Sequence, residues 1–207
     1  MAHEHDHEHD HEHDHDHDHD HEVDEEAVAR HLEGERAYMR RQALAQIRQY
    51  PDVALRMRAR EITEFDEFLV QLVERMFELM HDAQGVGLAA TQLGVLQRVF
   101  VFAPDEESAP RAIVNPRLTL DERDKLVEEE GCLSLREVRV PVERATRVVV
   151  EGQDPNGDDV RLELDGLAAR VVQHETDHLD GVLIIDRTDA ESRKQAIGEL
   201  RPQPSLV

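Results

Sequence analysis

The segment QHETDHLDG, residues 173–181, places His174 and His178 four residues apart, with Glu175 directly after the first histidine. On a helix, residues four apart project from one face, so both imidazoles can bind one metal ion. Glu175 is then placed to act on a water held by that ion. The intervening glutamate favours a metal site over two ordinary polar residues on a helix, but the pattern alone does not define the enzyme.

A catalytic metal usually has three protein ligands and a water, so this pair lacks one ligand. The segment HETDHLDGVLI nearly follows the metzincin pattern, but Ile184 stands where a third histidine is needed, and no methionine follows in the chain. Glu199 would complete a thermolysin-like endopeptidase site, but it lies in a polar segment near the chain end. Cys132, the single cysteine, is the remaining soft ligand. A lone cysteine is ordinarily a small buried apolar residue, but here it could complete the site, and a divalent ion would deprotonate its thiol.

Three segments together resemble the motifs of the peptide deformylase family. They are GVGLAATQ (85–92), EGCLS (130–134) and QHETDHLDG (173–181), in the order and at the approximate spacing of that family. YPDVALR (50–56) is similar to an early segment of the family, so the resemblance covers roughly residues 43–187. It implies an α+β fold and a metal-dependent hydrolase that removes the N-formyl group from new polypeptides beginning with formyl-methionine and releases formate.

The resemblance also implies a ligand set and a metal. Cys132, His174 and His178 would bind Fe²⁺, with Zn²⁺, Ni²⁺ or Co²⁺ as substitutes, and the spacing does not choose among these ions because two histidines and a cysteine suit several of them. The expected partners are N-formyl-Met nascent peptides and, as a further candidate, the ribosome. The family often has proline where this chain has Arg136, so the substrate contacts of that loop stay open.

The chemistry needs a proton carrier and donors to an oxyanion. Glu175, adjacent to a ligand but not itself one, would accept a proton from the attacking water and later deliver it to the leaving amine. The resemblance implies that the side-chain amide of Gln92 and the backbone N–H of Leu133 stabilise the oxyanion of the tetrahedral intermediate.

The glycines of GVGLAAT suggest a segment that another chain can approach closely. A peptide substrate could lie along it as an added strand, with its main chain hydrogen-bonded near Val86 and Gly87. Arg139 matches a family position near the downstream side of the substrate.

The first 26 residues differ in composition from the rest of the 207-residue chain. They alternate His with Asp or Glu and contain 10 of the 14 histidines, 13 of the 47 acidic residues and no basic residue. The formal net charge is −23 for the whole chain, and the other residues, with 24 basic and 34 acidic side chains, have a net charge of −10. Such a tract cannot build a core, so we expect it to be disordered and to bind transition metals weakly, whether it is native or a purification device.

Composition excludes several classes of protein. A net negative surface argues against direct nucleic-acid binding, which needs clustered Lys and Arg. One cysteine excludes an internal disulfide framework, and no run approaches the roughly 18 apolar residues of a membrane span. We therefore expect a cytoplasmic protein that contacts neither nucleic acid nor membrane.

The elements that position these residues can be predicted from hydrophobic spacing. A stripe of Phe, Leu and Met from Thr63 to Gly85 predicts a core helix, with Thr63 as its N-cap. Alternating or continuous apolar runs predict strands at 98–103 and 111–114, a hairpin of 147–153 with 160–165, and a helix from about Leu167 to Gly181 that carries the histidines. The fold class is α+β: a single domain with antiparallel strands packed around a C-terminal metal-binding helix.

The expected domain organisation has four parts: a disordered tail (1–26), an extension that could be helical (27–42), the catalytic domain (43–187) and a C-terminal tail (188–207). A hypothesis from a different class is a metal-binding or ribosome-associated protein that keeps this fold without turnover, with the His-rich tail as its main feature. The joint presence of Cys132, Glu175 and Gln92 argues against it, because a protein without turnover does not need all three.

Overall fold

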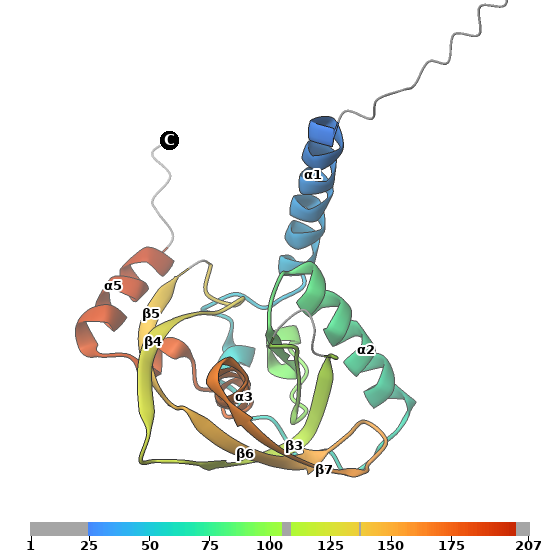
Figure 1. The fold of residues 1–207 in the computed structure, drawn as a ribbon, viewed down its shortest axis with the longest axis vertical. Helices are drawn as coiled ribbons and strands as arrows, with labels where there is room; N and C mark the ends of the chain where they lie inside the picture. The colour runs from blue at the N-terminus through green and yellow to red at the C-terminus, as the bar shows by residue number, and fades with distance from the viewer. Residues whose placement is uncertain (1–24, 105–108, 137, 202–207) are drawn as a thin grey trace, which may run out of the picture.

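The helix that carries the two histidines, α3 (Gly166–Leu179), lies between two antiparallel sheets (Figure 1). The computed structural model describes residues 25–104, 109–136 and 138–201, so the expected disordered tail lies outside the described residues except for its last two positions. The other helices are α1 (Glu25–Leu44), η1 (Val53–Arg56), α2 (Glu67–Asp82), η2 (Ala90–Leu93), α4 (Ile184–Arg187) and α5 (Ala190–Leu200). The strands are β1 (Gly87–Ala89), β2 (Val99–Phe102), β3 (Arg111–Leu120), β4 (Lys125–Gly131), β5 (Arg139–Ala145), β6 (Arg147–Gln153) and β7 (Asp159–Asp165).

Within the described residues, five strands form one sheet in the order β1-β2-β3-β6-β7, and β4 pairs with β5 in a second sheet. All of these pairings are antiparallel. The predicted hairpin is present, with β6 and β7 in register from Arg147 opposite Asp165 to Gln153 opposite Asp159. Mixed helices and antiparallel strands confirm the α+β class.

The apolar run of β2 is buried on both faces. Val99 and Val101 pack into the cluster that contains α2, whereas Phe100 and Phe102 pack into the cluster that contains α3. A strand covered by helices on both sides needs a continuous apolar sequence rather than an alternating one. This layer of α2, sheet and α3 fixes the edge of β1 next to the helix that carries the histidines.

The predicted core helix is confirmed as α2, but its expected start was wrong. Asp66, not Thr63, is the N-cap, and its side chain accepts the backbone N–H of Leu69 at 3.1 Å. A carboxylate accepts hydrogen bonds from the free N–H groups of the first turn as well as a hydroxyl does. Its negative charge also interacts favourably with the positive end of the helix dipole. Phe68, expected in the stripe, is 54% exposed, because the helix turns that side to solvent.

The pair β4–β5 was not predicted from the sequence. In β4 only Glu130 is buried, so the strand lacks the apolar alternation by which strands are recognised. It is held by its partner β5, where Val140 and Val142 enter the core.

Both ends of the described chain are helical. The extension expected from 27–42 forms α1, which projects from the body and is buried only at its C-terminal end, at Ala43 (Figure 1). Part of the expected C-terminal tail forms α5, in which Ala196 and Leu200 are buried against β5 and α4. None of the described helices is long and apolar enough to cross a membrane.

Candidate active site

The residues of the predicted ligand set lie together although they come from different elements. His174 and His178 lie one turn apart on α3, and Cys132 directly follows β4. The ligand atoms of the three side chains all lie within 4.8 Å of one another, and Cys132 Sγ is 3.2 Å from His178 Nε2. The backbone N–H of Ser134 donates to the same sulfur at 3.4 Å. One sulfur and two imidazoles at this spacing fit a divalent transition metal in tetrahedral or related geometry.

The protonation of the two histidines follows from their surroundings. Burial lowers the pKa of His178 well below its ordinary value, and the nearby cations His174 and Arg144 lower it further. His178 is therefore neutral, which is the form that binds a metal. Burial also lowers the pKa of His174, but hydrogen bonds to Cys132 and Glu130 outweigh burial and raise it. Because Nδ1 of His174 faces Glu130 at 3.1 Å, Nε2 remains for the ligand cluster.

A buried network of charges holds His174 in place, and sequence reasoning missed it. Arg144 binds both carboxylate oxygens of Glu130, at 2.9 and 3.0 Å, and also binds Asp177 on α3. Arg170 donates to Glu130 as well, at 2.8 Å. Burial raises the pKa of Glu130, but hydrogen bonds from His174 and Arg144 outweigh it and hold the pKa at about 2. Glu130 therefore stays ionised and can orient the imidazole. The position of Glu130 directly before Gly131 and Cys132 was the feature of the sequence that could have indicated this role.

Glu175 lies beside the ligand cluster as a buried carboxylate. It is 4% exposed, and its Oε2 has no hydrogen-bond partner among the described residues. Burial raises its pKa to about 7, even though the neighbouring His174 lowers it. A carboxyl group that titrates near neutrality can both accept and release a proton at working pH. A buried oxygen without a partner indicates a group, such as water or a substrate, that binds there.

Two further groups face the cluster from Gln92 and Leu133. Oε1 of Gln92 accepts the backbone N–H of Ala89 at 2.9 Å, which turns its Nε2 toward Ser134 Oγ at 3.1 Å and Cys132 Sγ at 3.9 Å. The carbonyl of Cys132 accepts a turn hydrogen bond from Leu135. The N–H of Leu133 lies on the opposite side of that planar peptide and donates to no other described residue. Both groups can donate to an oxygen held near the cluster.

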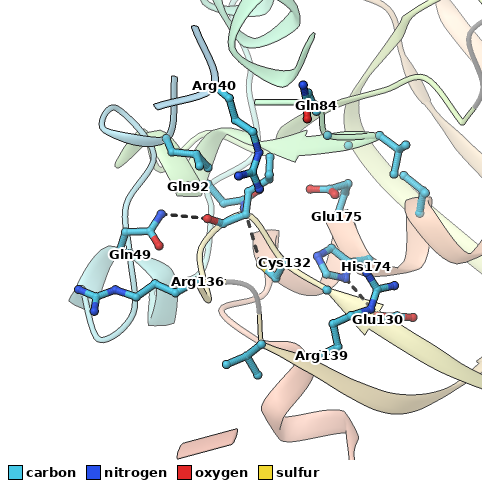
Figure 2. A pocket seen from close by; sticks show the side chains of 18 of the residues that line it. Arg40, Gln49, Gln84, Gln92, Glu130, Cys132, Arg136, Arg139, His174 and Glu175 are labelled. Carbon is cyan, nitrogen blue, oxygen red and sulfur yellow. Dashed lines mark hydrogen bonds and ion pairs between the residues drawn. The ribbon is translucent and has the colours of Figure 1, made fainter. Parts of the chain in front are cut away.

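An open pocket of about 980 Å³ leads to these groups (Figure 2). Nine site residues were predicted from the sequence. Eight of them line this pocket: Val86, Gly87, Gln92, Cys132, Leu133, Arg139, His174 and Glu175. The ninth, His178, is buried next to Cys132. Residues that the sequence did not indicate also line it, including Arg40, Gln49 and Leu167. Gln49 donates to the carbonyl of Leu133 at 2.9 Å and so fixes the loop that follows Cys132.

One wall of the pocket is the free edge of β1. The carbonyl of Val86 accepts the N–H of Ala103 and thus faces β2. Main-chain groups of an antiparallel strand alternate in direction, so Gly87 presents its N–H and carbonyl to the pocket. Its missing side chain is also required, because a Cβ at Gly87 would overlap the carboxylate of Glu175.

Glu199, the alternative third ligand, is exposed on α5 and accepts a hydrogen bond from Gln195 at 3.1 Å. The ligand cluster found among the described residues does not include it. The geometry of the described residues therefore does not support the endopeptidase hypothesis.

A buried carboxylate beside a cluster of one cysteine and two histidines, at the base of an open pocket, is the arrangement of a metal-dependent hydrolase. Comparisons with known proteins place the chain within this class. The sequence model of the polypeptide deformylase family matches residues 44–194. The chain is 48% identical over 147 residues to a peptide deformylase of Thermotoga maritima, and the aligned region covers 71% of this chain and 88% of that protein.

Comparison with solved structures leads to the same family as the sequence comparisons. The crystal structure of the Thermotoga maritima peptide deformylase superposes with a TM-score of 0.66 and covers 69% of this chain and 96% of the other. A peptide deformylase from Synechococcus elongatus in complex with actinonin, 36% identical, has a TM-score of 0.70 and covers 74% and 85% of the two chains. The chain belongs to the polypeptide deformylase family, and it is a hydrolase that removes N-formyl groups.

Replacing Gly87 with alanine is expected to lower kcat/KM for a formyl-Met peptide by roughly 10²-fold, the loss that a displacement of about 1 Å can cause. The added methyl group would displace the Glu175 carboxylate while leaving all three candidate metal ligands in place. Formate release and metal content would be measured together. Gly34→Ala is the matched control, because a Cβ at Gly34 meets nothing within 4 Å. Equal activity of the two variants would show that the position of Glu175 tolerates this shift.

Proposed function

We propose that the chain removes the N-formyl group from formyl-methionine at the start of nascent polypeptides, with Cys132, His174 and His178 as metal ligands and Glu175 as the proton carrier. The observation that carries this assignment is the buried carboxylate of Glu175, with an unpaired oxygen, beside three ligand atoms within 4.8 Å of one another. We propose Fe²⁺ as the native metal, with Zn²⁺, Ni²⁺ or Co²⁺ as substitutes, because a set of two histidines and a cysteine suits all four. A bound divalent ion would lower the pKa of a water and polarise the formyl oxygen.

The residues of this chain would then carry out three tasks. Glu175 accepts a proton as the water oxygen attacks the formyl carbon, and returns it to the nitrogen as the carbon–nitrogen bond breaks. Formate and the free amine of methionine are the products. The Nε2 of Gln92 and the N–H of Leu133 donate to the formyl oxygen as it gains negative charge.

The substrate main chain would lie along the free edge of β1. Gly87 offers the outward N–H and carbonyl there, and Val86 and Arg139 also line the pocket. Arg139 would contact the downstream side of the substrate. Nascent chains that begin with formyl-methionine are made on ribosomes, so the ribosome is the proposed partner and the cytoplasm the proposed location.

The test is formate release from a formyl-Met tripeptide by protein prepared without oxygen and loaded with Fe²⁺. We expect turnover that stops when a chelator removes the metal and returns with added Fe²⁺. An acetyl-Met peptide of the same sequence is the control for the formyl group. Mass spectrometry of an internal peptide substrate tests the endopeptidase alternative. Absence of formate from protein with one metal per chain would overturn the proposal.

A further inference from the structure

A short segment between α1 and η1 contacts the main chain of both residues proposed to donate to the oxyanion. The backbone N–H of Arg48 donates to the carbonyl of Gln92, in η2, at 2.7 Å. The side-chain Nε2 of Gln49 donates to the carbonyl of Leu133 at 2.9 Å (Figure 2). Two adjacent residues therefore join the element that carries one proposed donor to the loop that carries the other.

Apolar contacts hold both ends of this segment in place. Ile47 is 3% exposed and lies in the apolar cluster that contains α2. Tyr50 packs against the apolar cluster that contains residues of β5, and its N–H donates to the carbonyl of Ser134 at 2.9 Å. The segment is therefore anchored on either side of Gln49.

The side chain of Gln49 has a defined orientation. Gln49 is half-buried, and its Nε2 donates to the carbonyl of Ile47 at 3.3 Å as well as to that of Leu133. Both partners are carbonyl oxygens, so the nitrogen of the amide and not its oxygen must face them. Both N–H groups of the amide are thereby used.

The bond from Gln49 restricts the direction of the N–H that would donate to the oxyanion. The peptide group before Leu133 carries that N–H, and its carbonyl, from Cys132, accepts the N–H of Leu135 at 3.0 Å. The peptide group after Leu133 is held by Gln49. Each peptide group is planar, so fixing the carbonyls on both sides of Leu133 leaves its N–H few directions. A donor that is already aimed needs no reorganisation as charge develops, which is the basis of oxyanion stabilisation.

We propose that Gln49 is a positioning residue for the hydrolysis. Through the carbonyl of Leu133, it keeps the N–H of Leu133 aimed, together with Nε2 of Gln92, at the formyl oxygen as that oxygen gains negative charge. This inference rests on the proposed function, and Gln49 acts through Leu133 rather than on the reacting atoms. Arg48 contributes through its backbone, which a side-chain substitution does not remove, so Gln49 is the position to test.

The first test is Gln49→Met in the iron-loaded full chain with a formyl-Met tripeptide. Methionine keeps the length of the side chain and removes both N–H groups. We expect kcat to fall by roughly tenfold, and by no more than about 10²-fold, the loss that a displacement of about 1 Å can cause. KM should change little, because the interaction strengthens only as the oxygen gains charge in the transition state. Metal content and circular dichroism, measured on the same preparation, should match those of the unmodified chain.

A rescue variant and a control separate donation from packing. Gln49→His should restore part of the rate, because a neutral imidazole can donate one N–H to the Leu133 carbonyl. Equal kcat values for the methionine and histidine variants would show that the donor is irrelevant. Gln46→Met is the matched control, since Gln46 is exposed and its side chain bonds to Gln42 and Arg75, on α1 and α2. The control should keep normal kcat and KM.

A thioformyl-Met tripeptide tests whether Gln49 acts on the oxyanion. Sulfur is a weak hydrogen-bond acceptor, so donors aimed at this atom contribute less to hydrolysis of the thioformyl group. Release of the free methionine amine would be measured for both peptides. Gln49→Met should lower kcat for the thioformyl peptide by a smaller factor than for the formyl peptide. A general distortion of the site would lower both by the same factor.

Unchanged kcat in Gln49→Met, or equal factors for the two peptides, would overturn the positioning role and leave the deformylase assignment intact. Loss of metal from Gln49→Met would also overturn it, because Gln49 would then support the ligand set rather than the donor. Absence of formate from the unmodified chain would overturn the proposed function itself.

Discussion

Replacing Glu175 with glutamine is expected to leave the metal and the fold in place and to reduce formate release by about 10²–10⁴-fold, the usual contribution of a general acid–base group. Glutamine keeps the size and shape of the side chain but cannot accept the proton of the attacking water. The three proposed protein ligands remain for the metal, so its content should stay at one per chain. The main chain of the substrate would still bind along β1.

Stability offers a second measurement on the same variant. Burial raises the pKa of Glu175 to about 7 from an ordinary value near 4.5. The folded state therefore binds a proton more tightly than the unfolded state, and the charged form of Glu175 costs stability as the pH rises from about 4.5 through 7. A neutral amide removes this cost, so the thermal midpoint of the metal-free variant at pH 8 should not fall.

Metal content, formate production and binding of the formyl-Met peptide would be measured on one preparation, with Glu74→Gln on the exposed side of α2 as a control. Near-normal turnover in the Glu175 variant would refute its role as proton carrier. Loss of metal would instead make Glu175 a member of the coordination shell.

Replacing Cys132 with alanine is expected to abolish stoichiometric metal binding and to lower formate release by at least about 10²-fold, since even the loss of an outer partner of a ligand costs 10–100-fold. The remaining two histidines cannot hold a divalent ion against dilution. Glu199→Ala should change neither quantity, because Glu199 is exposed on α5.

Metal content after dialysis and formate release at saturating Fe²⁺ would separate the two variants. Circular dichroism would show whether the Cys132 variant retains its secondary structure. The reverse pattern, with metal lost only in the Glu199 variant, would restore the endopeptidase hypothesis and remove Cys132 from the site.

The sequence by itself determined the elements whose interactions are local. The spacing of His174 and His178 places them on one face of α3 because a helix repeats every 3.6 residues. The hairpin β6–β7 and the apolar stripe of α2 are likewise set by nearby residues, and the structure contains both. The three motifs also allowed the family to be recognised before any geometry was known.

Only the tertiary structure decided which distant groups meet. Cys132 lies 46 positions from His178, and no local pattern places its sulfur 3.2 Å from that imidazole. The buried contacts of Glu130 with Arg144 and Arg170 could not be predicted, because every other residue of β4 is exposed and the strand has no apolar alternation. Arg40, which also lines the pocket, was likewise not indicated by the sequence. The periodicity of a sequence shows only which face of a helix or strand is buried. Which other segment covers that face depends on how the buried side chains pack, and this packing exists only in the folded chain.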